Sequence, residues 1–565
     1  MNCRPFAWER SYPAGVVWDT LIVLSTIPTL LAGTVAAHGA STAIEFRGRC
    51  ISYNDLGRDA ERFGAALISA VGLKPGTTLA LYLPNTPYHP QAFFGAAMAG
   101  LRTVHLSPLD AERELAHKLA DSAARILVTT NIAGMMERAE RLLDAGLVDL
   151  LIVGDDAYWG PSPMPPTPIV ERRGVVALHT LVADAAPPPS WPEVKPDDVA
   201  LLQYTGGTTG MPKGAILTHG NLTAAVSMYE AWFTAEESGR TERDRIICVL
   251  PLFHIYALTT ILLRGLRKGA EIMLRARFDV DTTLRDIETG RATHFPGVPT
   301  MWIALSASPG IETRDFSSLV YTGSGGAPLP VEVADRFERL TGHRLIGGWG
   351  MTETSPAGTN RLGAGPRKAG TIGLPLPGIE MDICSLDDPS RVLGIGETGE
   401  LRIRGPNVTR GYWNRPVETA ASFVGNWFLT GDIGYMDADG FFFITDRKKD
   451  MIISGGFNVY PQMVEQAIYQ HPAVEEVLVV GIPDGYRGEA GKAFIKLRAG
   501  SEPFGLDALQ AFLKDKIGRH EMPTALEFRA ALPRTAVGKL SKIELREEER
   551  AKATCFEARP ASASA

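Results

Sequence analysis

The segment YTGGTTGMPKG, residues 204–214, has the composition of a loop that holds a polyphosphate. Its four glycines let backbone N–H groups approach a bulky anion, its three threonines add hydroxyl donors, and Lys213 adds a charge. Apolar residues at 199–202 and 215–217 predict a strand on each side of the loop. The segment differs from the usual P-loop because no Ser or Thr follows the lysine. A flexible Gly/Thr hairpin is the alternative interpretation.

Two further segments place polar groups where a ligand could reach them. GWGMTET, residues 348–354, sets the Thr352 hydroxyl beside the Glu353 carboxylate. The hydroxyl can donate to a phosphate oxygen, and the carboxylate suits Mg²⁺. TGSGGAPL, residues 322–329, turns at the end of a predicted strand, which is where open α/β sheets bind ligands. A plain tight turn is the alternative for the second segment.

The sequence TGGTTGMPKG resembles the phosphate-binding signature of the adenylate-forming enzymes. These include acyl-CoA synthetases, luciferases and the adenylation domains of peptide synthetases. The later motifs of that family follow in its order, so the resemblance spans roughly residues 42–542. YRGEAGKAFIKL, residues 486–497, and FDVDTTLRDIE, residues 278–288, are similar to segments of bacterial fatty-acyl-CoA ligases, which makes that subgroup the most similar one.

The resemblance implies that several separate segments bind ATP and AMP. The Gly/Thr loop would hold the phosphates, the turn after residue 324 would lie along the adenine, and Asp432 with Arg447 would hold the ribose hydroxyls. A surface salt bridge is the alternative for that pair. Trp349 stands where a tyrosine is usual, so it keeps an aromatic face for the adenine and lacks the phenolic hydroxyl. The residues implied in this way are Thr205, Gly206, Gly207, Thr208, Thr209, Gly210, Lys213, Gly325, Gly326, Ala327, Trp349, Gly350, Met351, Asp432 and Arg447.

The resemblance also implies four catalytic residues. PRTAVGKLSK, residues 533–542, is similar to the C-terminal catalytic motif of the family and makes Lys539 its lysine; a solvated lysine is the alternative. His254, in the segment PLFHIYAL, would lie near the substrate carboxylate, although a lone histidine between apolar residues is more often part of a core. Thr352 and Glu353 complete the set, with Glu353 as the ligand of Mg²⁺.

The charged run DRKKDMIISGGFNVYP, residues 446–461, resembles the hinge of the family. Lys449 matches the pivot position, where Asp is common and Lys also occurs. Gly455 and Gly456 match a loop that lines the path of the CoA pantetheine once the small domain has rotated. The resemblance therefore implies two conformations, one for each half-reaction.

Together these residues predict an ATP- and Mg²⁺-dependent acyl-CoA synthetase with CoA as its co-substrate. A carboxylate would attack the α-phosphate of ATP, giving an acyl-AMP and pyrophosphate, and CoA would then take the acyl group. Medium- to long-chain fatty acids are the expected substrates, with aryl acids and dicarboxylates as alternatives. The expected acyl pocket lies near Trp232, the helix after His254 and residues 298–300.

Three other functions stay open. The chain could be an adenylating enzyme that loads a carrier protein, or one that oxidises its adenylate. It could also be a nucleotide-binding regulator without activity, although the retention of both Lys539 and Glu353 argues against that. Carboxylate-dependent exchange of pyrophosphate with ATP separates the regulator from the enzymes.

At 565 residues the chain is too long for one core, so at least two domains are expected. Apolar runs alternate with helical segments, which predicts an α/β fold with doubly wound sheets in a large N-terminal domain. Shorter strands between glycines after Ile379 predict a small β-rich subdomain, and a second pattern predicts a small, mobile α+β C-terminal domain. The predicted bounds are 1–446 for the N-terminal adenylation domain, 447–450 for the hinge, 451–548 for the C-terminal domain and 549–565 for a disordered tail.

Composition favours a cytoplasmic globular protein. The net charge of −7 gives no reason to expect nucleic acid as a partner, and a peripheral contact with membranes stays open. The five cysteines are scattered and form no C-x-x-C pair, so neither a disulfide framework nor a zinc site is indicated.

The N-terminal region carries two local predictions. The apolar run 20–37 could be a signal peptide, but Asp19 and Pro28 interrupt that pattern and favour a helix packed on the domain. Residues 44–53 predict a hairpin, and residues 54–72 predict a helix with Asn54 as its N-cap.

Overall fold

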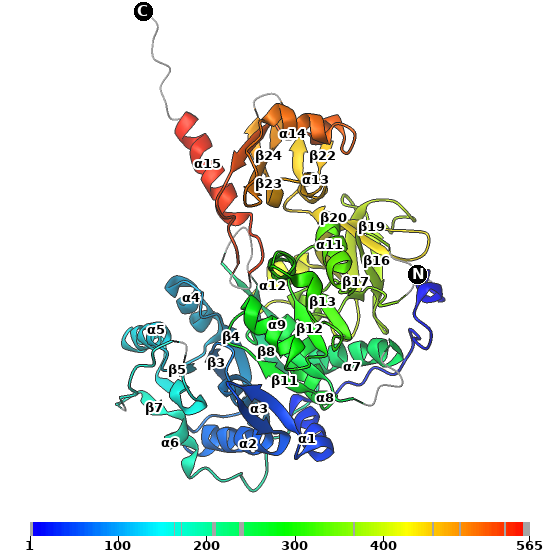
Figure 1. The fold of residues 1–565 in the computed structure, drawn as a ribbon. Helices are drawn as coiled ribbons and strands as arrows, with labels where there is room; N and C mark the ends of the chain where they lie inside the picture. Colours follow the sequence, from blue (N-terminus) through cyan, green and yellow to red (C-terminus); the bar gives the residue numbers. More distant parts are fainter. Residues whose placement is uncertain are drawn as a thin grey trace, which may run out of the picture.

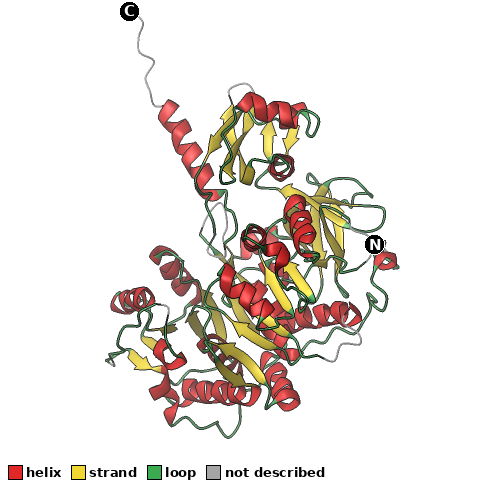
Figure 2. Ribbon diagram, viewed as in Figure 1, coloured by secondary structure: helices red, strands yellow, loops and turns green. Residues whose placement is uncertain are grey.

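The structure is a computed structural model, and it describes residues 4–162, 164–170, 172–205, 211–236, 242–364, 368–454, 457–484, 487–535 and 538–557. Figure 1 shows a large N-terminal domain with a smaller C-terminal domain beside it. Sheets and helices occur in both domains (Figure 2), which confirms the predicted α/β class.

One seven-stranded sheet supplies the strands on either side of the Gly/Thr loop. Its order is β7–β6–β5–β3–β4–β8–β9, and every neighbouring pair is parallel except β8 with β9. The central strands are buried along their whole length, as strands covered on both faces must be. The strands are β3 Thr78–Tyr82, β4 Arg102–Leu106, β5 Ile126–Thr130, β6 Leu150–Gly154, β7 Val175–Ala177, β8 Val199–Thr205 and β9 Lys213–Thr218, and the intervening helices are α3 Tyr88–Met98, α4 Glu112–Ser122, α5 Ala133–Asp144 and α6 Leu178–Ala183.

A six-stranded sheet completes the doubly wound part of the large domain. Its order is β13–β12–β10–β11–β1–β2, and the predicted hairpin forms its antiparallel edge. The remaining pairs are parallel. The strands are β1 Thr42–Phe46, β2 Arg49–Ser52, β10 Arg245–Cys248, β11 Glu271–Leu274, β12 His294–Gly297 and β13 Tyr321–Ser324, and the helices of this part are α7 His219–Glu236, α9 Val280–Glu288, α10 Pro299–Ser306 and α11 Val331–Thr341.

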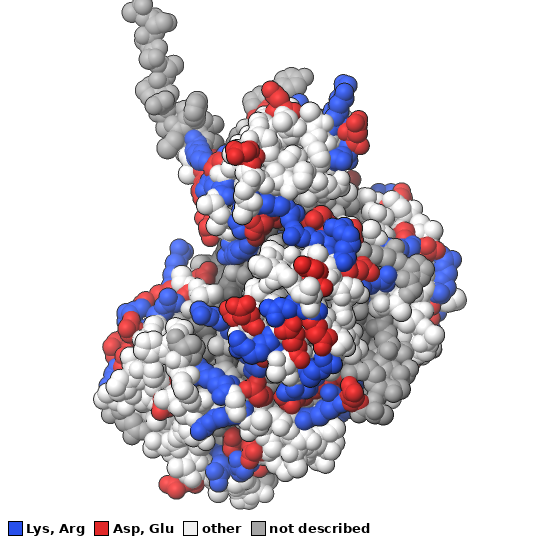
Figure 3. All heavy atoms as spheres, in the orientation of Figure 1, with Lys and Arg blue, Asp and Glu red and all other residues white. Residues whose placement is uncertain are grey.

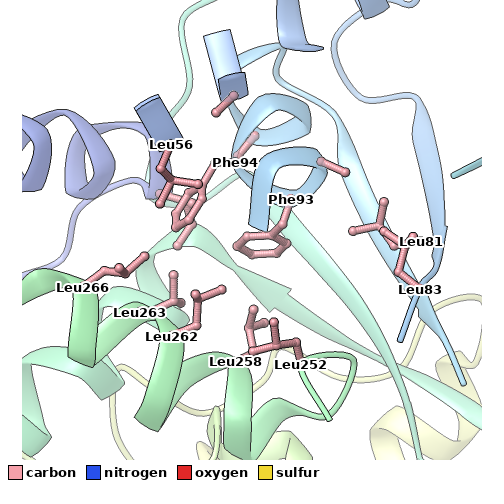
Figure 4. Packing of buried hydrophobic residues seen from close by; sticks show 14 of the residues in the cluster. Leu56, Leu81, Leu83, Phe93, Phe94, Leu252, Leu258, Leu262, Leu263 and Leu266 are labelled. Atoms are coloured by element: carbon pink, nitrogen blue, oxygen red, sulfur yellow. The ribbon is translucent and has the colours of Figure 1, made fainter. Parts of the chain in front are cut away.

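The helical run after β10 lies in the largest hydrophobic core. It consists of a π-helical segment, η3 Ala257–Leu263, followed by α8 Arg264–Arg267. Figure 4 shows Leu258 and Leu262 of this run facing Phe93 of α3, and all three side chains are buried. Each such burial stabilises the fold by about 1.5–3 kcal/mol. This packing fixes the position of a helix that also borders the site described below.

The predicted β-rich subdomain is a third sheet, and the C-terminal domain contains a fourth. The orders are β14–β15–β20–β19–β17–β16 and β22–β21–β24–β23, with β18 paired to β19 and β25 paired to β24. The strands are β14 Thr359–Asn360, β15 Thr371–Pro375, β16 Glu380–Cys384, β17 Gly399–Arg404, β18 Phe423–Val424, β19 Trp427–Met436, β20 Phe442–Arg447, β21 Ile452–Ser454, β22 Phe457–Val459, β23 Val474–Asp484, β24 Gly488–Leu497 and β25 Ala525–Phe528, and the helices are α12 Pro416–Ala421, α13 Pro461–Tyr469, α14 Leu506–Leu513 and α15 Ile543–Glu557.

Helix α15 extends into the segment predicted as a disordered tail. Glu549 of this helix pairs with Lys492 of β24 at 2.8 Å, so the helix is tied to the fourth sheet. The residues after Glu557 lie outside the described part of the chain.

The apolar run near the N-terminus is not one helix. Helix α1, Ile27–His38, begins only after Thr26, whose side chain caps it by accepting a hydrogen bond from the Thr29 N–H. Before it the chain runs over the third sheet in coil and turns, with a short 3-10 helix at Glu9–Ser11, and the Trp18 indole donates to the Ile379 carbonyl at 2.7 Å. Pro28 sits at the start of the helix, where its missing N–H costs nothing. No helix among the described residues is long and apolar enough to cross a membrane.

The predicted cap of the next helix was wrong by two residues. Helix α2 spans Tyr53–Ser69, and Ser52 is its N-cap. Ser52 and Asp55 form a reciprocal capping box, which satisfies two N–H groups where a cap at Asn54 would satisfy one.

On the visible face in Figure 3, basic and acidic side chains are mixed over both domains.

Candidate active site

A cavity of about 680 Å³ lies where loops from the three sheets of the large domain meet the C-terminal domain. The loops follow the ends of β8, β10 and β13, which is the edge where open α/β sheets bind ligands. The predicted site residues that line it are Thr205, Lys213, His254, Gly325, Gly326, Trp349, Gly350, Met351, Thr352, Glu353, Arg447, Lys449 and Lys539.

A second cavity of about 450 Å³ adjoins the first and shares several of its walls. Ala327 and Asp432 line it, together with Gly326, Trp349 and Lys539. The predicted loop residues Gly206, Gly207, Thr208, Thr209 and Gly210 lie outside the described part of the chain, as do Gly455 and Gly456. Strands β8 and β9 confirm the strand–loop–strand arrangement around the first of these two loops.

Glu353 is a buried carboxylate on the wall of the cavity. Burial raises its pKa, and the Tyr412 hydroxyl, which donates to Oε1 at 2.8 Å, opposes that rise. The Lys213 ammonium lies 4.9 Å from the centre of the Tyr412 ring, where a cation is attracted to an aromatic face. Sequence reasoning missed Tyr412, because nothing in its neighbourhood indicates contact with a residue 59 positions away.

Asp432 and Arg447 form an ion pair across two antiparallel strands. They are directly opposite each other in the β19–β20 register, and Arg447 Nε lies 2.7 Å from Asp432 Oδ1. The Trp349 indole N–H donates to the other oxygen, Oδ2, at 2.7 Å. The tryptophan therefore orients the buried carboxylate, a role that the sequence did not predict. Stacking of its ring on an adenine stays a prediction.

Lys539 reaches the cavity from the C-terminal domain. Its Cε lies so close to Gly326 that a Cβ on that glycine would stand 2.8 Å away, and Gly326 has a φ of +77°. Thr300 of the large domain donates to the Gly538 carbonyl at 3.3 Å, which holds the segment in place. Burial, with a smaller effect from the nearby Arg447 charge, lowers the pKa of Lys539 to about 8.

His254 is neutral and has a defined tautomer. Burial, aided by the positive charge of Lys539, lowers its pKa to about 3. The Tyr256 backbone N–H donates to Nδ1 at 3.2 Å, so Nδ1 is the acceptor nitrogen. The proton of the neutral ring is then on Nε2, which can donate to a carboxylate oxygen.

Two ion pairs of half-buried side chains lie beside the predicted hinge. Lys542 lies 2.8 Å from Glu465 of α13, and burial raises the pKa of that carboxyl to about 7. Arg546 pairs with Asp450 at 2.8 Å. Lys449, next to Asp450, lines both cavities, so the predicted pivot lies at the border of the site.

The metal site fits an ion that arrives with a nucleotide. Among the described residues, no group of three His, Cys, Asp or Glu side chains could hold a metal alone. Mg²⁺ commonly binds through one or two carboxylates together with substrate phosphates. A single carboxylate such as that of Glu353 on the cavity wall is compatible with that pattern.

The inner part of the cavity has two of the three walls expected for the acyl pocket, because residues near Trp232 and the helix after His254 line it. Trp232 is fully buried in another core, and residues 298–300 line only the second cavity. Tyr229 and Phe233 of α7 take the place expected for Trp232. The residues that line this part, missed by sequence reasoning, also include Tyr256, Thr260, Arg264, His294 and Tyr321.

Comparison with known proteins identifies relatives over nearly the whole chain. The family pattern described as AMP-binding enzyme matches residues 31–413, and the AMP-binding enzyme C-terminal domain matches residues 463–539. The chain is 36% identical to a long-chain-fatty-acid–CoA ligase of Bacillus subtilis (strain 168), over 96% of this chain and 98% of that protein. It is 37% identical to a feruloyl-CoA synthase of an Amycolatopsis species, over 90% of this chain and 95% of that protein. The crystal structure of ATP-bound MatB from Rhodopseudomonas palustris is similar, with a TM-score of 0.81 and 27% identity. The match covers 93% of this chain and 99% of that one.

The Trp349–Asp432 hydrogen bond can be tested by Trp349→Phe. This change keeps an aromatic ring and removes the donor to a buried carboxylate, so we expect the free energy of unfolding to fall by about 1–3 kcal/mol. ATP should also bind more weakly in calorimetric titrations, because Asp432 is free to turn. Trp18→Phe, which loses an indole hydrogen bond at a residue that lines neither cavity, should leave ATP affinity unchanged. Equal ATP affinity in both variants would contradict the positioning role.

Proposed function

Because the chain belongs to the AMP-binding enzymes and is an acid–thiol ligase, we propose that it joins a medium- to long-chain fatty acid to CoA through an acyl-AMP. The observation that carries this proposal is the position of Lys539. A lysine near the end of the chain lies enclosed in the same cavity as His254 and Glu353, which come from distant loops. A lysine that served only to solvate the surface would not be enclosed in a cavity with these groups.

In the first half-reaction a substrate carboxylate attacks the α-phosphorus of ATP, and pyrophosphate leaves. Two anions must meet, so the main task is to align them and to neutralise charge. Lys539, Lys213 and Arg447 supply three cations on the cavity wall. Neutral His254 donates from Nε2 to the carboxylate, and Thr352 donates to a phosphate oxygen. Mg²⁺ held by Glu353 would neutralise phosphate charge.

In the second half-reaction the CoA thiolate attacks the acyl carbonyl carbon, and AMP leaves. We infer that the C-terminal domain, residues 451–548, rotates about residues 447–450 relative to residues 1–446 for this step. Rotation would withdraw Lys539 and bring Gly455 and Gly456 toward the acyl-AMP. The ion pairs at the border, Lys542–Glu465 and Arg546–Asp450, join groups that all follow residue 449, so this rotation can leave them intact.

The acyl group is the finer part of the proposal. Similarity to the Bacillus subtilis ligase supports a fatty acid, and similarity to the feruloyl-CoA synthase supports an aryl acid. Tyr256, Thr260 and Arg264 of the helical run after His254 line the cavity over about 12 Å, which favours an elongated chain over a single ring.

Lys539→Ala tests the proposed function directly. Loss of one cation from the adenylation transition state should slow carboxylate-dependent ATP–pyrophosphate exchange by roughly 10²–10³-fold. Supplied with preformed acyl-AMP and CoA, the variant should still form the thioester at a near-normal rate. Lys496→Ala, which removes a lysine paired with Glu475 on the same domain, should change neither rate.

Three results would overturn this assignment. Equal loss of both half-reactions in Lys539→Ala would show that the lysine does not serve adenylation alone. Pyrophosphate exchange in the wild type without transfer to CoA would favour an enzyme that loads a carrier protein. Absence of exchange with every carboxylate would favour a regulator.

The pKa of Lys539 predicts the pH dependence of adenylation. The lysine must be charged to act, and its pKa of about 8 means that it loses its proton as the pH rises through that value. We therefore expect kcat/KM for ATP, which reports groups of the free enzyme, to fall between about pH 7 and 9. Lys539→Arg should lack this basic limb, because a guanidinium stays protonated. The same limb in both enzymes would assign it to another group.

Glu353→Gln tests the proposed metal ligand. The amide oxygen can still accept from Tyr412, so the fold should be kept, but the charge that attracts Mg²⁺ is lost. The Mg²⁺ concentration needed for half-maximal adenylation should rise by more than about 10-fold. Loss of a residue that only supports a metal ligand already costs about that much in affinity. Glu380→Gln, which removes a surface partner of Arg404, is the control. An unchanged Mg²⁺ titration would exclude Glu353 as the ligand.

A further inference from the structure

Helix α4 contacts the chain on both sides of the Gly/Thr loop. Before the loop, the Tyr204 hydroxyl donates to Asp121 Oδ2 at 2.7 Å. After the loop, His117 Nε2 lies 3.0 Å from the Pro212 carbonyl, and because a carbonyl only accepts, the imidazole is the donor. His117 and Asp121 are spaced by four and therefore lie on the same face of the helix. One helical face thus holds the chain where it enters the loop and where it leaves it.

Asp121 also holds the segment that follows Tyr412. Arg415 Nη1 lies 3.4 Å from the second carboxylate oxygen, Oδ1. The Trp413 indole and the Asn414 amide donate to the Asp121 backbone carbonyl at 3.1 and 3.0 Å. Two segments that are far apart in the sequence therefore meet at this one residue.

Both of these segments carry groups of the active site. Tyr204 and the next residue, Thr205, line the first cavity. In the other segment the Tyr412 hydroxyl donates to Glu353, the proposed metal ligand, at 2.8 Å. The contacts of Asp121 therefore determine how the start of the phosphate-binding loop lies relative to the metal-binding carboxylate.

Tyr204 transmits the position of Asp121 to the loop. Its ring packs on Gly214, the residue directly opposite in the β8–β9 register, where an added Cβ would stand 3.1 Å from Cζ. Burial, together with the hydrogen bond to Asp121, raises the pKa of the Tyr204 hydroxyl, so the hydroxyl keeps the proton that it donates. The side chain is thus held by packing along the ring and by a hydrogen bond at its tip.

The Asp121 carboxylate does not face a substrate. Its side chain is 9% exposed, and it lines neither of the two cavities described above. It also lies in the last turn of α4, where a negative charge opposes the helix dipole and destabilises the helix. Its location is therefore explained by its contacts with other segments and not by the stability of α4.

We propose that Asp121 is a positioning residue for ATP, which fixes the start of the phosphate-binding loop through Tyr204 while His117 of the same helix fixes the end. This inference rests on the proposed acyl-CoA synthetase activity. ATP carries β- and γ-phosphates for the loop to hold, whereas acyl-AMP does not. The contribution of Asp121 is therefore confined to the first half-reaction.

The experiment compares Asp121→Ala with the wild type in both half-reactions. In carboxylate-dependent pyrophosphate exchange, kcat/KM for ATP should fall by about 10- to 100-fold, the usual effect of losing a residue that orients the groups of a site. Thioester formation from preformed acyl-AMP and CoA should stay near the normal rate. A loss of stability alone would lower both rates.

Asp156→Ala is the matched control for this variant. Asp156 is also a buried aspartate, it pairs with Arg47 at 2.9 Å, and it lines neither cavity. Its loss should leave the ratio of the two half-reaction rates as in the wild type.

Two further variants test the route through Tyr204. Tyr204→Phe keeps the ring on Gly214 and removes only the hydroxyl, so kcat/KM for ATP should fall by about 10-fold. With Asp121 already replaced by alanine, adding Tyr204→Phe should change kcat/KM by less than about 2-fold, because the partner of the hydroxyl is gone. An unchanged kcat/KM in Tyr204→Phe would overturn the proposal even if Asp121→Ala did not fold.

The outcomes separate this inference from the function on which it rests. Equal loss of both half-reactions in Asp121→Ala, or losses that multiply in the double variant, would overturn the positioning role and leave the synthetase intact. Absence of exchange with every carboxylate in the wild type would overturn both.

Discussion

The site depends on holding one ammonium group between two domains. Lys539 comes from the C-terminal domain, yet its side chain lies against Gly326 of the large domain, where an added Cβ would displace the lysine side chain. Glycine suits this position for two reasons, the close approach of the lysine and the positive φ. Burial lowers the lysine pKa to about 8, so the charge is held with little solvation and is available to a phosphate. Motion of the C-terminal domain therefore also moves a charge.

The large domain supplies rigid positions for the groups that face this lysine. The loops after β10 and β13 emerge at the same end of the six-stranded sheet, because parallel strands end on the same side, and the loop after β8 comes from the seven-stranded sheet. Asp432 and Arg447 face each other because β19 and β20 are antiparallel and in register. The sheets thus bring together residues that are far apart in sequence. Each local motif then supplies a suitable side chain at the end of its strand.

This dependence explains what could be predicted from the sequence. The fold class follows from the alternation of strands and helices, and the candidate site residues were expected because local motifs resemble those of the adenylate-forming enzymes. The Tyr412–Glu353 and Trp349–Asp432 contacts are set by tertiary packing alone, and no local pattern indicates them. Arg264 was hidden for another reason. In LLRGLRKG it reads as a basic residue near a helix end, where cations are common, and only burial distinguishes it from Arg267.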